Sequence, residues 1–430
     1  MDIIRGAFGL CVLIGIAWLF SKNKSKVDWR LVITGVFLQI TFGVLITQID
    51  AVAQAFHWVS KGFVKLLSFT SAGSIFLFGD LANGNLGNMF AFQILPTILF
   101  FSTVSAALYY LGVLQKIVKG IAWVMAKTMK LSGAESLSAA GNIFLGQTEA
   151  PLLVKPFINK MTSSELMCLM TGGMATIAGG VLAAFVVTLG GDNPEEQTKF
   201  AAYLLSASIM NAPAAIVMAK MIIPETQKDL INQKLEVNSE QMGVNLIDAL
   251  SRGAADGLKL ALNVGGMLLA FTALIALMNY FFKDILGDLI ALSDCTLNQW
   301  IVKSTDGAFN GFTMQYIFGQ VFRLLSWTIG VEWSDTLMVG SLIGEKTVVN
   351  EFFAYERLGK VKELLSPKSV IIATYALCGF SNFSSIAIQI GGIGGMAPQR
   401  QSDLSQLGMR ALLAATLACL MTATIAGMII

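Results

Sequence analysis

Two short polar strings in an otherwise apolar sequence carry the side chains that could do chemistry. The first reads Gly-Gln-Thr-Glu-Ala-Pro at residues 146–151, and the second reads Asn-Glu-Phe at residues 350–352. Each lies between apolar arms of roughly ten residues, which would cross only half of a bilayer. Because carboxylates are costly at membrane depth, Glu149 and Glu351 are candidates for a binding site.

The ends of the first string contain residues that favour a turn between two helices. Gly146 is predicted to end the first arm in the left-handed conformation that glycine tolerates. Pro151 is predicted to stand in the first turn of the second arm, where its missing N–H is not needed. The segment Glu135–Met161 is therefore interpreted as a hairpin that enters and leaves the membrane on one side.

The middle of the first string can bind a polar heterocycle. Gln147 and Thr148 provide hydrogen-bond donors and acceptors that lipid could not satisfy. Glu149 lies beside a helix N-terminus, where the helix dipole favours a carboxylate. An alternative remains open, in which Glu149 forms a structural salt bridge with Lys155 or Lys346.

A second group of polar residues suits a sugar. A carboxylate such as Glu351 can accept two hydrogen bonds from vicinal hydroxyls, as on a ribose. The string at residues 380–385 interrupts an apolar run, and its Asn382 and Ser385 lie three residues apart, on one helix face. Phe380 could pack edge-on against a ring. The alternatives are that Glu351 only caps its own hairpin and that Phe380 is a core residue.

Asn142 and Thr176 are candidate ligands for a cation. A Na+ site needs only oxygen ligands, from amides, hydroxyls and unwound carbonyls. Thr176 precedes the Gly179-Gly180 pair, where an apolar helix can open and expose its carbonyls. The alternative is that the Thr176 hydroxyl bonds back to its own helix.

The composition excludes several classes of protein. The chain has 430 residues, of which 55% are hydrophobic and 13% charged, against roughly 25% charged residues in soluble domains. It is predicted to be an all-α polytopic membrane protein. The net charge of +2 and the lack of a basic tract argue against nucleic-acid binding. Five cysteines without paired spacing, and one histidine, argue against a disulfide framework or a metal cluster.

Three kinds of apolar segment position these residues. Eight full spans are predicted at Ile3–Phe20, Leu31–Thr47, Phe90–Leu111, Leu166–Leu189, Phe200–Ile223, Ala254–Phe282, Val370–Ile390 and Leu407–Ile430. Amphipathic helices in the membrane interface are predicted at Val52–Phe69, Leu114–Lys130 and Phe312–Trp327. Re-entrant hairpins are predicted at Glu135–Met161 and Trp333–Tyr355. The glycine-rich string at 391–395 is predicted to be a loop.

The distribution of Lys and Arg gives an orientation. The loop Ser21–Arg30 holds four basic residues and is predicted to be cytoplasmic, which places both termini outside. Residues 114–223 and 312–430 then repeat one order of elements with inverted topology, which is typical of secondary transporters. Four regions follow: scaffold at 1–111, a first repeat at 112–223, scaffold at 224–310 and a second repeat at 311–430.

The chain resembles the concentrative nucleoside transporters in three motifs that occur in order. These are Gly-Gln-Thr-Glu-Ala-Pro-Leu at residue 146, Asn-Glu-Phe at residue 350 and Phe-x-Asn-Phe-Ser-Ser at residue 380. The resemblance implies a homotrimer in the bacterial plasma membrane, whose inner transport domain moves against an outer scaffold. It implies a base site made of Gly146, Gln147, Thr148, Glu149, Val181 and Phe380. It implies a ribose site made of Glu351, Asn382 and Ser385.

The resemblance also implies the coupling ion. Na+ would be held by the side chains of Asn142 and Thr176 and by the carbonyls of Leu145 and Ile177. Some family members use protons and depart from asparagine at the position of Asn142, which this chain keeps, so Na+ is favoured. Proton coupling through Glu149 or Glu351 stays open. An intramembrane acid–base enzyme is a third reading, which no metal cluster or nucleophile string supports. Purine and pyrimidine nucleosides are not distinguished.

Overall fold

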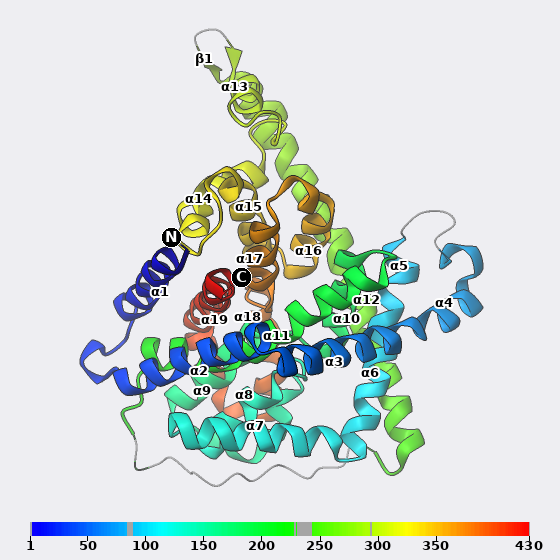
Figure 1. Ribbon diagram of the computed structural model, residues 1–430, viewed down its shortest axis with the longest axis vertical. Helices are drawn as coiled ribbons and strands as arrows, with labels where there is room; N and C mark the ends of the chain where they lie inside the picture. The colour runs from blue at the N-terminus through cyan, green and yellow to red at the C-terminus, as the bar shows by residue number, and fades with distance from the viewer. Residues whose placement is uncertain (1, 84–88, 228, 230–242, 293–294, 430) are drawn as a thin grey trace.

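The chain forms helices almost throughout, because backbone groups in lipid must be satisfied within each segment. A computed structural model describes residues 2–83, 89–227, 229, 243–292 and 295–429. Within these residues the only strands form an antiparallel ribbon, β1 (Ala291–Leu292) and β2 (Cys295–Thr296). Figure 1 shows this ribbon and α13 (Leu297–Ser304) at one tip of the molecule.

The remaining helices follow in two long runs. The first run comprises α1 (Asp2–Leu19), α2 (Trp29–Gln48), α3 (Asp50–Ser68), α4 (Thr70–Phe78), α5 (Phe90–Gln93), α6 (Leu95–Tyr110), α7 (Val113–Met129), α8 (Gly133–Gly141), η3 (Ala150–Lys160), α9 (Ser163–Ala175), α10 (Gly179–Gly190) and α11 (Pro194–Ile222). The second comprises α12 (Leu246–Asn279), η5 (Tyr280–Gly287), α14 (Met314–Thr328), α15 (Thr336–Val348), α16 (Glu351–Val361), α17 (Pro367–Leu377), α18 (Phe383–Met396) and α19 (Gln401–Ile429). Short 3-10 turns join several of them.

Eight segments of the described chain are long and apolar enough to cross a membrane, the number predicted. One member differs. The predicted span Val370–Ile390 is two shorter helices, α17 and α18, because the backbone leaves the helical conformation between them. The segment Asp50–Leu81 takes its place by length and composition, although its first part was predicted to lie in the interface.

Two apolar runs are broken at the predicted positions. Residues 176–178 separate α9 from α10, and residues 378–382 separate α17 from α18. The second break requires a glycine, since Gly379 has φ +155° and a Cβ there would lie 2.7 Å from the Ala175 carbonyl oxygen. The two breaks touch, because the Phe380 N–H donates to the Thr176 carbonyl at 3.3 Å.

The two predicted hairpin segments fold back on themselves with their bases at opposite ends of α11. The base of the α8–η3 segment lies at the end of α11, where Ser164 Oγ donates to the Ile223 carbonyl at 2.7 Å. Beyond the α15–α16 segment, Lys362 Nζ donates to the Leu189 carbonyl, just before α11 begins. A helix of 29 residues is about 43 Å long, so the bases lie roughly a membrane thickness apart.

The helices divide into an enclosed group and an outer group. In α9–α10, α11 and α19, 78% of the most apolar window is buried within the chain, against 17% in α12 and 22% in α6. Figure 1 shows α6 and α12 side by side at the edge of the molecule. Helix α10 approaches α6 closely at two glycines, since a Cβ on Gly179 would overlap Phe101 Cε1 and one on Gly180 would lie 3.4 Å from the Ile98 carbonyl oxygen.

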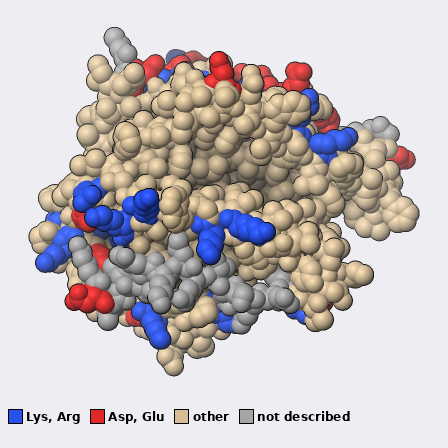
Figure 2. Space-filling view, turned by 60° about the horizontal axis from the view of Figure 1, so that its bottom comes forward, with Lys and Arg blue, Asp and Glu red and all other residues tan. Residues whose placement is uncertain are grey.

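Lys and Arg gather on one face. Figure 2 shows them on the face at the bottom of Figure 1, with some Asp and Glu among them, and shows further Asp and Glu along the upper edge of Figure 2. The loop after α1 lies beside the end of α11, because the Lys22 N–H donates to the Ile222 carbonyl at 2.8 Å. The predicted cytoplasmic loop at 21–30 therefore lies at the same end of the molecule as the C-terminus of α11.

The loop prediction for the glycine-rich string at 391–395 is wrong. These residues continue α18, which ends at Met396. Gly392 serves packing rather than a turn, because a Cβ there would lie 2.8 Å from Thr148 Cγ2. Helix α18 can therefore approach the tip of the α8–η3 segment closely.

Candidate functional site

The tip of the α8–η3 segment brings the first polar string against α18. Gln147 Nε2 donates to Ser385 Oγ at 3.2 Å, and both side chains are buried. The Gly146 N–H donates to Glu149 Oε2 at 3.2 Å. One detail of the prediction is wrong: Gly146 is not in the left-handed conformation, because α8 already ends at Gly141 and several turns lead to the string. Pro151 does stand in the first turn of the following helix.

The second polar string meets the break between α17 and α18. Asn382 Nδ2 donates to Glu351 Oε2 at 2.7 Å. Asn382 Oδ1 accepts from the Ser385 N–H at 2.9 Å, so Asn382 caps α18. The cap of α16 is Asn350, whose side chain accepts from the Phe353 N–H. Glu351 is therefore placed by Asn382 rather than by the capping role considered from sequence.

Four of the predicted substrate residues form one hydrogen-bonded chain, namely Gln147, Ser385, Asn382 and Glu351. Ser385 joins the two halves, because its N–H bonds Asn382 and its hydroxyl accepts from Gln147. Phe380 is 8% exposed and Val181 is 1% exposed. One of the two alternative partners considered for Glu149, Lys346, donates to the Ala376 carbonyl at 2.9 Å.

The predicted cation ligands stand at the ends of two helices. Asn142 follows the last residue of α8 and Thr176 follows the last residue of α9. Both helices thus direct the negative end of their dipole toward this region, which favours a cation. The two helices are close, since a Cβ on Gly172 would lie 2.9 Å from Asn142 Nδ2.

Several buried polar atoms near these helix ends have no partner among the described residues. Neither amide atom of Asn142 has a hydrogen-bond partner among the described residues, and the same holds for Gln147 Oε1 and Ser381 Oγ. Such atoms are rare in folded proteins and call for an explanation. The Thr176 hydroxyl donates to the Gly172 carbonyl of its own helix at 2.9 Å, which is the alternative considered from sequence. Its oxygen lone pairs can still coordinate a cation.

Sequence reasoning missed three buried side chains that hold the breaks in place. Asn211 Nδ2 donates to the Ala175 and Cys378 carbonyls, each at 2.7 Å. Ser208 Oγ donates to the Ile143 carbonyl at 3.0 Å, and Gln389 Nε2 donates to the Met170 carbonyl at 3.0 Å. Their signal was available, since each is a polar residue in an apolar helix.

A cavity of about 250 Å3 reaches Glu149 from the side of the outer helices. Hairpin-tip and α10 residues line one wall, among them Leu145 and Gly179. Residues of α6 and α12 line the other wall, among them Arg252 and Asp256. The polar string is therefore approached between the enclosed group and the outer group of helices.

Helices broken at membrane depth, with their ends at buried polar side chains, define this protein as a membrane transporter by class. Comparisons with known families identify the kind of transporter. Family models described as the Na+ dependent nucleoside transporter N-terminus, nucleoside recognition and the Na+ dependent nucleoside transporter C-terminus match residues 8–81, 91–192 and 203–427. The chain belongs to the concentrative nucleoside transporter family, as its motifs predicted.

Individual relatives match this chain over all or nearly all of its length. An uncharacterized transporter, YutK of Bacillus subtilis, is 42% identical, with all of both chains covered. Solute carrier family 28 member 3 of Rattus norvegicus is 41% identical over 98% of this chain and 58% of its own. The solved structure of CNTnw in an inward-facing substrate-bound state is similar at 38% identity, with a TM-score of 0.86 over 100% of this chain and 99% of that one. A CNTnw variant in an outward-facing state is equally similar in TM-score.

Proposed function

We propose that this protein imports nucleosides by symport with Na+, through movement of an inner transport domain across the membrane. The observation that carries the proposal is the meeting of the two helix breaks. At one break, buried oxygen atoms of the kind that coordinate a hard cation lack hydrogen-bond partners among the described residues. At the other break, the Glu351 carboxylate and the Asn382 amide form a pair suited to sugar hydroxyls. The family to which the chain belongs supports nucleosides as the substrate class.

Two groups of side chains divide the substrate between them. Gly146, Gln147, Thr148 and Glu149 face the base, and Val181 and Phe380 pack against it. Glu351, Asn382 and Ser385 hold the ribose hydroxyls. The hydrogen bond between Gln147 and Ser385 supports this division, because it joins the two groups edge to edge. The 250 Å3 cavity at Glu149 supports an approach from the scaffold side.

The Na+ site uses the side chains of Asn142 and Thr176 and the carbonyls of Leu145 and Ile177. Its support is the pair of unsatisfied amide atoms on Asn142 and the convergence of two helix C-termini. Na+ entering with a nucleoside down a tenfold gradient and −100 mV would release about 3.7 kcal/mol, enough for roughly 500-fold accumulation.

The moving unit comprises the two repeats, within residues 112–223 and 311–430, and the scaffold comprises residues 1–111 and 224–310. The close approach of α10 to α6 at Gly179 and Gly180 supports a sliding surface, because these two residues have no side chain that could interlock with α6. We also propose a homotrimer in the bacterial plasma membrane with both termini outside. The clustering of Lys and Arg on one face supports this orientation.

Labelled-uridine uptake into proteoliposomes tests the proposal. We expect uptake under an inward Na+ gradient and none under an inward proton gradient alone. Uptake driven by protons alone would keep the substrate class and replace the ion site with a protonated carboxylate at Glu149 or Glu351. Failure of both gradients with uridine and with adenosine would contradict nucleoside transport.

Two adjacent glycines of α9 allow the ion and substrate sites to be perturbed separately. A Cβ on Gly172 would press on Asn142, whereas a Cβ on Gly173 would lie 2.6 Å from Gln389 Nε2 and 3.1 Å from Gln147 Cβ. We expect Gly172→Ala to raise the Na+ concentration for half-maximal uptake about tenfold, and Gly173→Ala to raise the nucleoside KM about tenfold. Uptake measured against each ligand in turn checks both, and each variant is the control for the other. The assignment of the two sites is contradicted if the effects are exchanged.

A further inference from the structure

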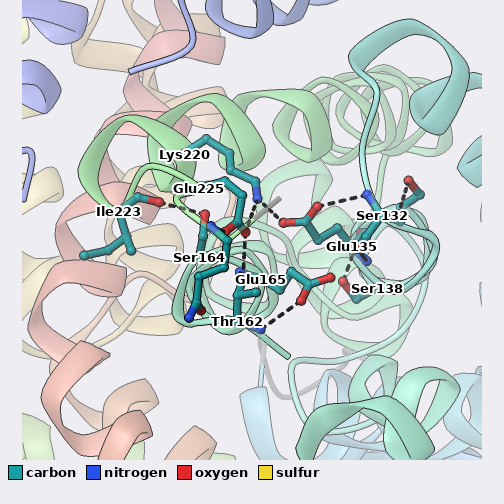
Figure 3. Close-up of polar contacts among 11 residues, drawn as sticks. Ser132, Glu135, Ser138, Thr162, Ser164, Glu165, Lys220, Ile223 and Glu225 are labelled. Carbon is teal, nitrogen blue, oxygen red and sulfur yellow. Dashed lines mark hydrogen bonds and ion pairs between the residues drawn. The ribbon is translucent and has the colours of Figure 1, made fainter. Parts of the chain in front are cut away.

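A buried charged cluster lies where α8 and α9 begin, at the ends of these helices remote from Asn142 and Thr176. Ser132 and Glu135 form a capping box at the start of α8, and Thr162 and Glu165 form a second at the start of α9. In each box the hydroxyl accepts from a backbone N–H while the carboxylate accepts from the cap N–H. Figure 3 shows both boxes near one lysine side chain, Lys220, whose amino group lies beside Glu135 and Glu225.

Lys220 of α11 connects the two boxes. Its ammonium group pairs with the Glu135 carboxylate and lies 3.6 Å from Glu225 Oε2. Glu225 accepts a hydrogen bond from Thr162 Oγ1 at 2.7 Å. One cation therefore ties the start of α8, the start of α9 and the end of α11 together (Figure 3).

The cluster depends on Lys220 being charged. Lys220 is 7% exposed and Glu135 is 1% exposed, and a buried charge persists only with its partner. Burial raises the pKa of Glu225, but hydrogen bonds from Thr162 and from the Gln227 N–H outweigh it, so that the pKa of this carboxyl is lowered. Glu225 is thus anionic at neutral pH. Removal of the lysine charge would leave two carboxylates without their common cation.

The same three helices are joined again at the proposed ion site. Ser208 of α11 bonds the Ile143 carbonyl, directly after Asn142, and Asn211 of α11 bonds the Ala175 carbonyl, directly before Thr176. Helix α8 is 9 residues long and α9 is 13 residues long, or about 14 and 20 Å. Both helices are therefore fixed to α11 at both ends, with the cluster at one end and the ion ligands at the other.

We propose that the Lys220 cluster, defined by Lys220, Glu135, Glu225 and Thr162, is a positioning device that sets the affinity of the Na+ site. The inference rests on the proposed Na+ symport. The spacing between Asn142 and Thr176 depends on how α8 and α9 lie on α11, and the cluster fixes that relation at their far ends. Lys220 itself does not touch the ion, so its role is positioning.

Lys220→Met tests the inference, because methionine keeps most of the length and removes the charge. We expect the Na+ concentration for half-maximal uridine uptake to rise 10- to 100-fold, the range known for residues that orient metal ligands. The uridine KM at saturating Na+ should change less than about threefold, since the proposed substrate residues share no hydrogen bond with the cluster among the bonds described above. Lys199→Met is the matched control on the same helix, where the side chain is exposed and pairs with Glu196 one turn away.

Glu225→Gln covers the case in which Lys220→Met does not fold. It keeps the shape of the side chain and weakens both the ion pair and the bond from Thr162, so we expect a smaller shift in the same direction. This inference alone would be overturned by two results together: the unaltered chain shows Na+-driven uptake, and a folded Lys220→Met or Glu225→Gln variant needs no more Na+ than the unaltered chain. Na+-independent uptake by the unaltered chain would overturn the proposed symport and this inference with it. An equal rise in the uridine KM would show a structural role only.

Discussion

Glu351→Gln is expected to lower nucleoside affinity roughly 100-fold, about 2.7 kcal/mol, while the protein stays folded. The carboxylate accepts from Asn382 Nδ2 at 2.7 Å and has further acceptor capacity for sugar hydroxyls. The amide that replaces it loses the charge and presents a donor on one side. Calorimetric titration of the purified protein with uridine, at saturating Na+, measures the change directly.

The matched control is Glu356→Gln, one and a half turns further along α16. Glu356 is a surface residue that pairs with Lys360 on its own helix, so the same change there should leave nucleoside affinity within twofold. Size-exclusion chromatography of both variants checks that the assembly is intact. An unaltered dissociation constant in the folded Glu351→Gln protein would remove Glu351 from the ribose site.

Asn142→Ala is expected to raise the Na+ concentration for half-maximal uptake at least tenfold, which corresponds to about 1.4 kcal/mol. The variant removes a buried amide whose oxygen and nitrogen have no other partner in the described part of the chain. Because those atoms are unsatisfied, the change should cost little folding stability while it removes an ion ligand. Uptake titrated with Na+ at several uridine concentrations separates this effect from one on the substrate.

Ser138→Ala provides the comparison, since Ser138 lies one turn earlier on α8 and its hydroxyl only bonds the Glu135 carbonyl of its own helix. We expect its Na+ requirement to be unchanged. If Asn142→Ala also leaves the Na+ requirement unchanged, the ion is bound elsewhere. A loss of thermal stability in Asn142→Ala larger than in Ser138→Ala would instead assign Asn142 a structural role.

Much of the fold could be predicted because lipid imposes strict rules on sequence. Apolar length identified seven of the eight segments that the structure supports as candidate spans. Both breaks were predictable, because glycine and hydroxyl-bearing residues interrupt the apolar runs at 176–180 and 379–385. Hydropathy alone could not separate an interfacial helix from a span at Asp50–Leu81, since an apolar continuation after Phe69 lengthens that segment.

The site could be predicted only as far as its motifs extend. The strings at residues 146 and 350 gave the side chains, and the structure brings Gln147 to Ser385 and Glu351 to Asn382. The supports on α11, Ser208 and Asn211, were not predicted because they belong to no motif and lie more than thirty residues away from the breaks they hold. The left-handed cap predicted at Gly146 was wrong because α8 already ends at Gly141. The loop predicted at 391–395 was wrong because these residues continue α18, where the missing side chain of Gly392 leaves room for Thr148.

The hydrogen bond between the two helix breaks makes the two proposed sites one thermodynamic unit. Thr176 belongs to the proposed ion site and Phe380 to the proposed nucleoside site, and the Phe380 N–H donates to the Thr176 carbonyl at 3.3 Å. A ligand that orders one break reduces the entropy that the other ligand must lose. Such assistance is reciprocal: the factor by which Na+ tightens nucleoside binding equals the factor by which a nucleoside tightens Na+ binding. We therefore expect a carrier with one ligand to hold it weakly, which limits the leak of either one alone.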